Sequence, residues 1–303
     1  LQDLHRALQK PVQVGRLARY TLYMSRASSF VHLHTHSHYS LLSALPKIKD
    51  LVAAAKADGQ TALALTDTDN LYGAIEFYKE CKTQGVKPII GVDLHMAPRT
   101  RHDKEHRIDD KTSRMVLLAK NKVGYKNLLK LVSRASLEGF YYTPRADREL
   151  LAEYRDGLIA ILPSFAAEPL RHLKENDSER AEESLAWYKE TFGKNLYAEI
   201  THHPEIDRHE AHMSAWKKFV KERGVPLIAA HDVYYLKPED ALARELVIKI
   251  KTGTVLDREY GVRADDFSFI TSSRAVELFK NEEEAVAHTR AISFCFNLIC
   301  LHT

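Results

Sequence analysis

The chain has 303 residues, 45% of them hydrophobic and 28% charged, which suits one large domain or two smaller ones. Its formal net charge of +3 is too small to argue for nucleic-acid binding by itself. Three cysteines without a Cys-x-x-Cys pair exclude a disulfide framework and a thiolate zinc site. No apolar run reaches the roughly 18–20 residues that span a bilayer, and the charged N-terminus lacks the apolar core of a secretory signal. We therefore expect a cytoplasmic protein with no membrane association.

Residues 1–29 differ in pattern from the rest of the chain, and we interpret them as an N-terminal extension. The chain begins with leucine and its first methionine is Met24, so we expect translation to start there and residues 1–23 to be non-native upstream sequence. The alternative is an amphipathic N-terminal helix, for which Leu4, Leu8 and Leu17 give only weak support.

From Phe30 onward, short apolar runs alternate with amphipathic segments of helical period. The expected strands are 30–34, 62–66, 87–94, 115–119, 157–162, 196–201 and 226–231. The expected helices are 46–59, 70–84, 124–136, 178–192, 208–224 and 238–251, with two more in 273–292. Such alternation is typical of parallel β/α units, and continuously apolar strands indicate a sheet covered on both faces. We predict an α/β fold, a distorted TIM-like parallel β/α barrel of about seven strands, with its chemistry at the carboxyl ends of the strands.

Two stretches interrupt this pattern. Residues 97–112 form a densely charged insertion, which we interpret as a solvated loop or, beside the barrel mouth, a contact for phosphate. Residues 293–303 are apolar and lack a natural stop, which suggests a truncation or a reading-frame error.

His34 and His36 directly follow the first expected strand. Alternate residues of an extended segment project to the same side, so these two imidazoles can hold one cation, most simply zinc or manganese. The chain has 16 histidines, and a solvated or packing role is the alternative for any of them.

Acidic residues or histidines also end most of the later strands. They are Asp67, Asp93, Glu199 with His203, and His231 with Asp232. Carboxylates and imidazoles that converge at one barrel mouth are what a multi-metal phosphoesterase needs. Polar residues after strands also serve as helix N-caps, and Asp67 and Asp69 are candidates for that role before the helix at Asn70.

At these positions the chain resembles the PHP (polymerase and histidinol phosphatase) domains of the bacterial DNA polymerase III alpha family, the replicative C-family polymerases. The resemblance covers about residues 30–292 in order. Its motifs are FVHLHTHSHYSLL (30–42), ALTDTDNLYGAIEFY (64–78), KPIIGVDL (87–94), LLAKN (117–121), GYKNL (124–128), EGFYY (138–142) and HDVYYL (231–236). The motifs GYKNL and NLYGA favour the polymerase branch over free-standing histidinol phosphatases.

The resemblance implies a set of metal ligands and a pair of catalytic carboxylates. The implied ligands of zinc or manganese are His34, His36, Asp93, Glu199, His203 and Asp232, and the implied catalytic residues are Asp67 and Asp232. The chain departs from the family pattern at Ser43, Thr68, Arg114, Phe165 and Tyr234, for which we expect structural roles. A three-metal site is therefore incomplete, unless His38, His202 or His231 replaces a lost ligand.

The resemblance also implies a function. Residues 30–237 would form the PHP barrel of a DNA-directed DNA polymerase, and residues 238–303 a helical segment leading toward polymerase domains absent from this sequence. The parent protein would use magnesium and contact DNA, a proofreading exonuclease and a sliding clamp. The barrel would brace the polymerase and could retain 3′–5′ exonuclease or phosphoesterase activity. The alternative is a free-standing phosphoesterase of the histidinol-phosphatase type.

Overall fold

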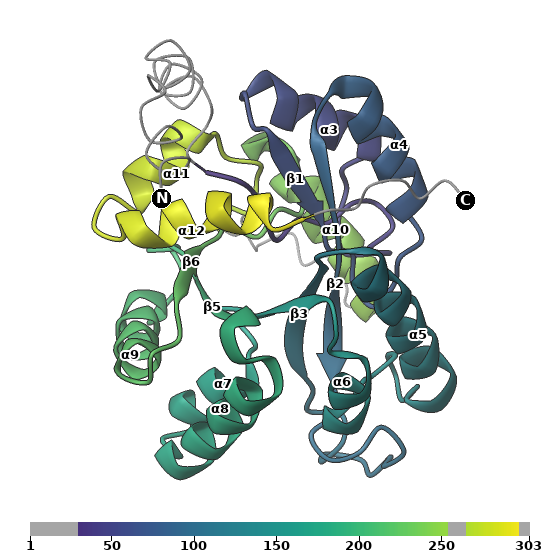
Figure 1. The fold of residues 1–303 in the computed structure, drawn as a ribbon, viewed down its shortest axis with the longest axis vertical. Coiled ribbons are helices and arrows are strands. Elements are labelled where there is room, and N and C mark those ends of the chain that lie inside the picture. Colours follow the sequence, from purple (N-terminus) through teal and green to yellow (C-terminus); the bar gives the residue numbers. More distant parts are fainter. Residues whose placement is uncertain (1–29, 254–264, 297–303) are drawn as a thin grey trace, which may run out of the picture.

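A computed structural model describes residues 30–253 and 265–296. The described part contains a six-stranded sheet in the order β1–β2–β3–β4–β5–β6, which curls around a buried interior with helices on its outside (Figure 1). The strands are β1 (Ala62–Leu65), β2 (Lys87–Met96), β3 (Ser113–Ala119), β4 (Leu158–Leu162), β5 (Leu196–Ile200) and β6 (Leu227–Ala229). The predicted α/β fold, a distorted TIM-like barrel, is confirmed, and all six strands lie where apolar runs predicted them.

The expectation of an all-parallel sheet is wrong for one strand. β3 pairs antiparallel with both β2 and β4, whereas the remaining neighbours pair in parallel. The charged insertion 97–112 explains this difference, because it contains no crossover helix. The chain therefore re-enters the sheet at the end where β2 leaves it, and the next strand runs antiparallel. β2 and β3 therefore form a long hairpin in which His95 lies opposite Arg114.

The expected first strand, 30–34, is not a regular strand. It is an extended segment that bonds to elements on both of its sides: Ala64 of β1 donates to the His32 carbonyl at 3.0 Å, and His36 donates to the Val233 carbonyl at 2.9 Å. Thr35 also forms an isolated parallel bridge with Val233. The described barrel therefore has six strands instead of seven, and the segment that carries the first histidines lies between its two edge strands.

Helices surround the sheet (Figure 1). They are α3 (Ile48–Ala57), α4 (Ala74–Gln84), α5 (Lys122–Glu138), α6 (Arg148–Tyr154), α7 (Glu168–Lys174), α8 (Ser178–Phe192), α9 (His209–Glu222), α10 (Ala241–Thr252), α11 (Ser272–Leu278) and α12 (Glu283–Phe294), with short 3₁₀ turns at Gly193–Asn195 and Pro238–Asp240. The short helices α6 and α7 were not predicted. Side-chain caps at Asn121, Asp147, Asp177 and Thr271 begin four of these helices.

The two faces of the strands build two different cores. In β1, Leu63 and Leu65 pack outward against α3 and α4, whereas Ala62 and Ala64 face the barrel interior. Ile89 and Ile228 belong to the same interior core, and Asp93 and Asp232 follow them at even spacing. Because side chains two residues apart point to the same face, these two aspartates face the barrel interior at its polar end.

The C-terminal described helices belong to this packing. Ile292 of α12 and the nearby Phe296 are buried in the interior core, and Thr289 accepts a hydrogen bond from the Val31 amide at 3.1 Å. The expected Met24 start, the N-terminal extension and residues 297–303 lie outside the described residues. None of the described helices combines the length and apolar character that crossing a bilayer requires.

Candidate metal centre

Five of the six predicted metal ligands meet at the polar end of the barrel. The extended segment supplies His34 and His36, β2 supplies Asp93, β5 supplies Glu199, and the residues after β6 supply Asp232. All five side chains are buried. Parallel strands bring their carboxyl ends to one edge of a sheet, which explains how residues up to 198 positions apart in sequence become neighbours.

His34 lies at the centre of the cluster. Its Nδ1 atom is 2.9 Å from Glu199 Oε2 and 3.0 Å from Asp232 Oδ1. Its Nε2 atom is 3.3 Å from Asp93 Oδ2. One imidazole therefore contacts three carboxylates, two on one side of the ring and one on the other.

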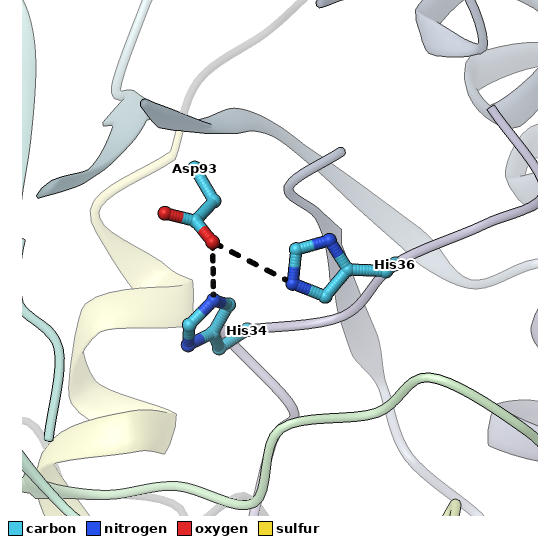
Figure 2. A group of neighbouring side chains, drawn as sticks. All are labelled: His34, His36 and Asp93. Carbon is cyan, nitrogen blue, oxygen red and sulfur yellow. Dashed lines mark hydrogen bonds and ion pairs between the residues drawn. The ribbon is translucent and has the colours of Figure 1, made fainter. Parts of the chain in front are cut away.

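His36 approaches Asp93 from a second direction, as Figure 2 shows. Its Nε2 atom is 3.7 Å from Asp93 Oδ2 and has no hydrogen-bond partner among the described residues. Its Nδ1 atom lies 3.1 Å from the Ser40 hydroxyl, and its ring stacks on Tyr234 with centroids 4.3 Å apart. The ring is thus held in place while one nitrogen remains available to a ligand.

Arg114 of β3 covers Asp93. Its Nε donates to Asp93 Oδ1 at 3.0 Å and one terminal nitrogen donates to Oδ2, so the pair is bidentate. Arg114 also lies 3.4 Å from His95 Nε2 and from the Thr68 hydroxyl. We expected Arg114 to have a structural role, and the hairpin register brings it directly onto a predicted metal ligand.

The electrostatics of the cluster follow from burial and from these contacts. Burial alone would lower the pKa of His34, but Asp232 and Glu199 outweigh it and raise that pKa well above its usual value. Burial and the neighbouring His34 lower the pKa of His36 to about 3. Burial would raise the pKa of Asp93, but the Arg114 guanidinium holds it far below its usual value. Burial raises the pKa of Glu199, with Asp232 adding to the effect.

Two groups of ligand atoms within the described residues fit a divalent cation. One is His34, His36 and Asp93, and the other is His34, Glu199 and Asp232; in each group the atoms lie within 4.8 Å of one another. Imidazole and carboxylate are ligands for zinc and manganese. His36 Nε2, an atom of the first group, is buried and has no hydrogen-bond partner in the described structure, whereas Asp232 Oδ1, an atom of the second group, faces His34 Nδ1 at 3.0 Å.

Asp67, a predicted catalytic residue, lies outside both groups. Its Oδ1 accepts from the Ser37 amide at 2.7 Å and the Ser40 hydroxyl at 2.6 Å, and its Oδ2 accepts from the Ser37 hydroxyl at 2.7 Å. These bonds hold the turn that comes after the two histidines. The alternative role of Asp67 as a helix N-cap is not seen, because α4 begins seven residues later, at Ala74, after an N-cap at Gly73.

His203, a predicted ligand, also lies outside both groups. Its Nδ1 atom is 2.9 Å from Glu205 Oε1, and its ring stacks on His231 with centroids 5.1 Å apart. His203 Nε2 and both ring nitrogens of His231 have no hydrogen-bond partner in the part of the chain that the structure describes. These two rings form a separate histidine pair beside the main cluster.

The residues that depart from the family pattern have identifiable contacts. Phe165 packs 5.5 Å from the His203 ring, and Ser43 accepts from Lys251 at 2.9 Å. Ser164 was missed by sequence reasoning: its amide and its hydroxyl both donate to Glu199 Oε1 at 3.0 Å. Its position directly after β4, at the same rim as the other strand ends, is the signal that could have revealed it.

Comparisons with known proteins identify relatives of this chain. The chain is 40% identical over 273 residues to the DNA polymerase III subunit alpha of Borreliella burgdorferi, covering 89% of this chain and 24% of that protein. The corresponding proteins of Treponema pallidum and Thermus aquaticus are each 38% identical, over 88% and 77% of this chain and 23% and 19% of theirs. The chain thus spans about a quarter of the length of these relatives.

Two solved structures were also matched, at low TM-scores. An amidohydrolase from Chromobacterium violaceum has a TM-score of 0.42 and 14% identity, covering 67% of this chain and 87% of its own. A two-domain protein from Bacteroides vulgatus, described as containing a predicted PHP-like metal-dependent phosphoesterase, has a TM-score of 0.45 and 12% identity, covering 88% and 68%.

The family of the chain is shown by a match to a protein-family model. The PHP domain model matches residues 32–203, a range that begins at the histidine segment and includes Asp93 and Glu199. The chain belongs to the PHP domain family.

Proposed function

We propose that the chain is the PHP domain of a bacterial replicative DNA polymerase of the DNA polymerase III alpha type and serves DNA replication in the cytoplasm. The 40% identity to the Borreliella burgdorferi subunit over 89% of this chain carries the proposal. Because the match spans 24% of that relative, we assign magnesium-dependent polymerisation to regions beyond this sequence. The barrel itself would brace those regions and present surfaces to the proofreading exonuclease and the sliding clamp, while DNA binds the full-length protein.

Primer extension tests this proposal. The product of the complete reading frame should incorporate deoxynucleotides on a primed template with magnesium, whereas residues 1–303 alone should not. Absence of incorporation by the complete product, under conditions where a known replicative polymerase extends the same template, would contradict the proposal.

We further propose that the cluster around His34 binds a divalent cation, either zinc or manganese. The convergence of Glu199 Oε2 and Asp232 Oδ1 on His34 Nδ1, at 2.9 and 3.0 Å in a buried cluster, supports this role. Elemental analysis of the protein, dialysed after incubation with each metal, should detect a bound ion. A protein that retains neither metal after both incubations would contradict this part of the proposal.

A second candidate function is a metal-dependent phosphoesterase, including a 3′–5′ exonuclease. A bound cation would polarise a phosphate and lower the pKa of a coordinated water. Asp232, 3.0 Å from His34, would then orient a reacting group, and we keep the predicted catalytic roles of Asp232 and Asp67 as hypotheses to test.

Hydrolysis assays separate the candidate substrates. Release of nucleotides from a labelled single strand in the presence of manganese or zinc would support the exonuclease, and the Asp232→Asn variant should abolish it. Hydrolysis of histidinol phosphate instead would support the free-standing phosphatase alternative. Absence of both activities would leave the barrel with its bracing role.

A further inference from the structure

His34 belongs to both candidate metal groups, but through opposite edges of its ring. Its Nδ1 atom faces Glu199 and Asp232, and its Nε2 atom faces Asp93. A neutral imidazole has one nitrogen with a free lone pair and one that carries a proton. The ring can therefore ligate a cation on one side only, while its other side donates a hydrogen bond.

Distances alone do not decide which side holds the cation. Ligand atoms around a tetrahedral zinc ion lie about 3.3 Å apart when each bond is near 2 Å. The pair His34 Nδ1–Asp232 Oδ1 is separated by 3.0 Å, and the pair His34 Nε2–Asp93 Oδ2 by 3.3 Å. Small movements would admit an ion at either place.

Arg114 distinguishes the two sides. Its guanidinium donates to both oxygens of Asp93, so the carboxylate of the first group is already paired with a fixed positive charge. A divalent ion between His36 and Asp93 would be repelled by the nearby guanidinium charge. It would also have to compete with the guanidinium for the oxygens of Asp93. Glu199 and Asp232 have no arginine or lysine among their ion-pair partners in the described structure.

The Arg114 guanidinium is itself held in place. Asp69 accepts from the His95 amide at 2.8 Å and lies 2.6 Å from His95 Nδ1. That contact turns His95 Nε2 toward Arg114, at 3.4 Å. The Arg114 amide also donates to the Ala166 carbonyl at 2.8 Å, which anchors the start of β3. Both the backbone and the side chain of Arg114 are thus positioned against Asp93.

We propose that the cluster binds one divalent cation, through His34 Nδ1, Glu199 and Asp232, and that Arg114 takes the place of a second cation on Asp93. Asp93 then receives a hydrogen bond from His34 Nε2–H and orients the ring, as carboxylates behind metal-bound histidines do. His36 is not a ligand in this arrangement. The inference rests on the proposed metal-binding role of the same cluster and sets its stoichiometry.

Metal stoichiometry tests the inference in the unaltered chain. Titration with Co²⁺ or Zn²⁺, followed by elemental analysis after gel filtration, should give one tightly bound ion per chain. Two or more tight ions would overturn the inference but leave the metal-binding role standing. If no ion binds, both the inference and the metal-binding role are wrong.

Substitutions identify the ligands. His36→Ala should leave the single ion and change its affinity less than about threefold, whereas Asp232→Asn should weaken binding roughly a hundredfold or more. His38→Ala alters a histidine of the same segment outside both groups and serves as the matched control. Loss of the ion in His36→Ala, with unfolding unchanged, would overturn the inference.

Arg114 is tested by charge. Arg114→His should admit a second ion and raise the stoichiometry from one to two, whereas Arg114→Lys keeps a positive charge and should stay at one. Circular dichroism and thermal unfolding establish that each variant is folded. A folded Arg114→His variant that still binds one ion would show that the guanidinium does not exclude the second, and if this variant fails to fold, the stoichiometry of the unaltered chain decides.

Discussion

Ser164 and Glu199 are joined by two hydrogen bonds, since both the amide and the hydroxyl of Ser164 donate to Glu199 Oε1 at 3.0 Å. This pair leaves Glu199 Oε2 directed at His34 Nδ1, 2.9 Å away. The same hydroxyl lies 2.8 Å from the Thr201 hydroxyl, so it is fixed from two sides. Ser164 therefore orients a proposed metal ligand without touching the proposed ion.

Ser164→Ala should weaken divalent-cation binding about 10–100-fold, because one oxygen of Glu199 loses its hydroxyl donor and the carboxylate becomes free to rotate. Competition with a chromophoric chelator measures the change. Ser136→Ala, on the exposed face of α5, is the control and should leave affinity unchanged. Equal cation affinity in the two variants would show that Ser164 does not support the metal site.

Asp67→Ala should lower the free energy of unfolding by about 3 kcal/mol, because two serine hydroxyls and a buried amide lose a charged acceptor. Asp67→Asn retains one carbonyl oxygen and should cost less. Chemical denaturation measures both changes, and metal content should not alter in either variant. A stable Asp67→Ala protein without hydrolytic activity would instead support the catalytic role.

Arg145 is a fully buried cation whose guanidinium donates to four backbone carbonyls, those of Gly139, Asp109, Arg101 and Asp103. Arg145→Met should destabilise the protein by about 3 kcal/mol or more, because buried carbonyls lose their donors. Limited proteolysis should then cut within the 97–112 insertion, which these bonds hold together. The exposed Arg155→Met is the control, and an unchanged cleavage pattern in Arg145→Met would contradict this role.

Gly124 allows α5 to pack against the Gly157 turn, since a Cβ at this position would lie 2.0 Å from the Gly157 carbonyl oxygen. Replacing a helical glycine with alanine ordinarily stabilises a helix by about 1 kcal/mol. Here Gly124→Ala should destabilise by about 1–3 kcal/mol, because the backbones must separate. Urea unfolding measures the change, with the exposed Lys126→Ala as control. A gain in stability would contradict the packing.

Cys81 should be unreactive in the folded protein. Its thiol is buried in the core between α4 and the sheet, and burial raises its pKa, so the nucleophilic thiolate is scarce at pH 8. In a Cys295→Ser/Cys300→Ser variant, iodoacetamide should modify the chain only after denaturant is added. The exposed Cys295, left alone in a Cys81→Ser/Cys300→Ser variant, should react readily. Fast native labelling of Cys81 would contradict the burial.

Sequence patterns identified most of the elements of the barrel. Apolar runs of four to six residues fell on β1 and β4 because both faces of these strands are covered, and a period of 3.6 residues marked α8 from Ser178 to Phe192. The spacing of apolar residues that are close together in the sequence indicates which face of an element is buried. The position of Asp93 in β2 and of Asp232 after β6 was predicted from the same pattern.

The pairing between distant segments was decided by the tertiary structure. The antiparallel direction of β3 depended on the insertion before it, and that direction brought Arg114 onto Asp93. The serine hydrogen bonds to Asp67 and the two hydrogen bonds from Ser164 to Glu199 depended on register between elements 27–35 residues apart. The sequence by itself determined which chemical groups reach the polar end of the barrel, because alternation and strand length are local. Only the folded arrangement decided which of these groups face one another, because a shift of one residue in strand register would turn each side chain to the opposite face.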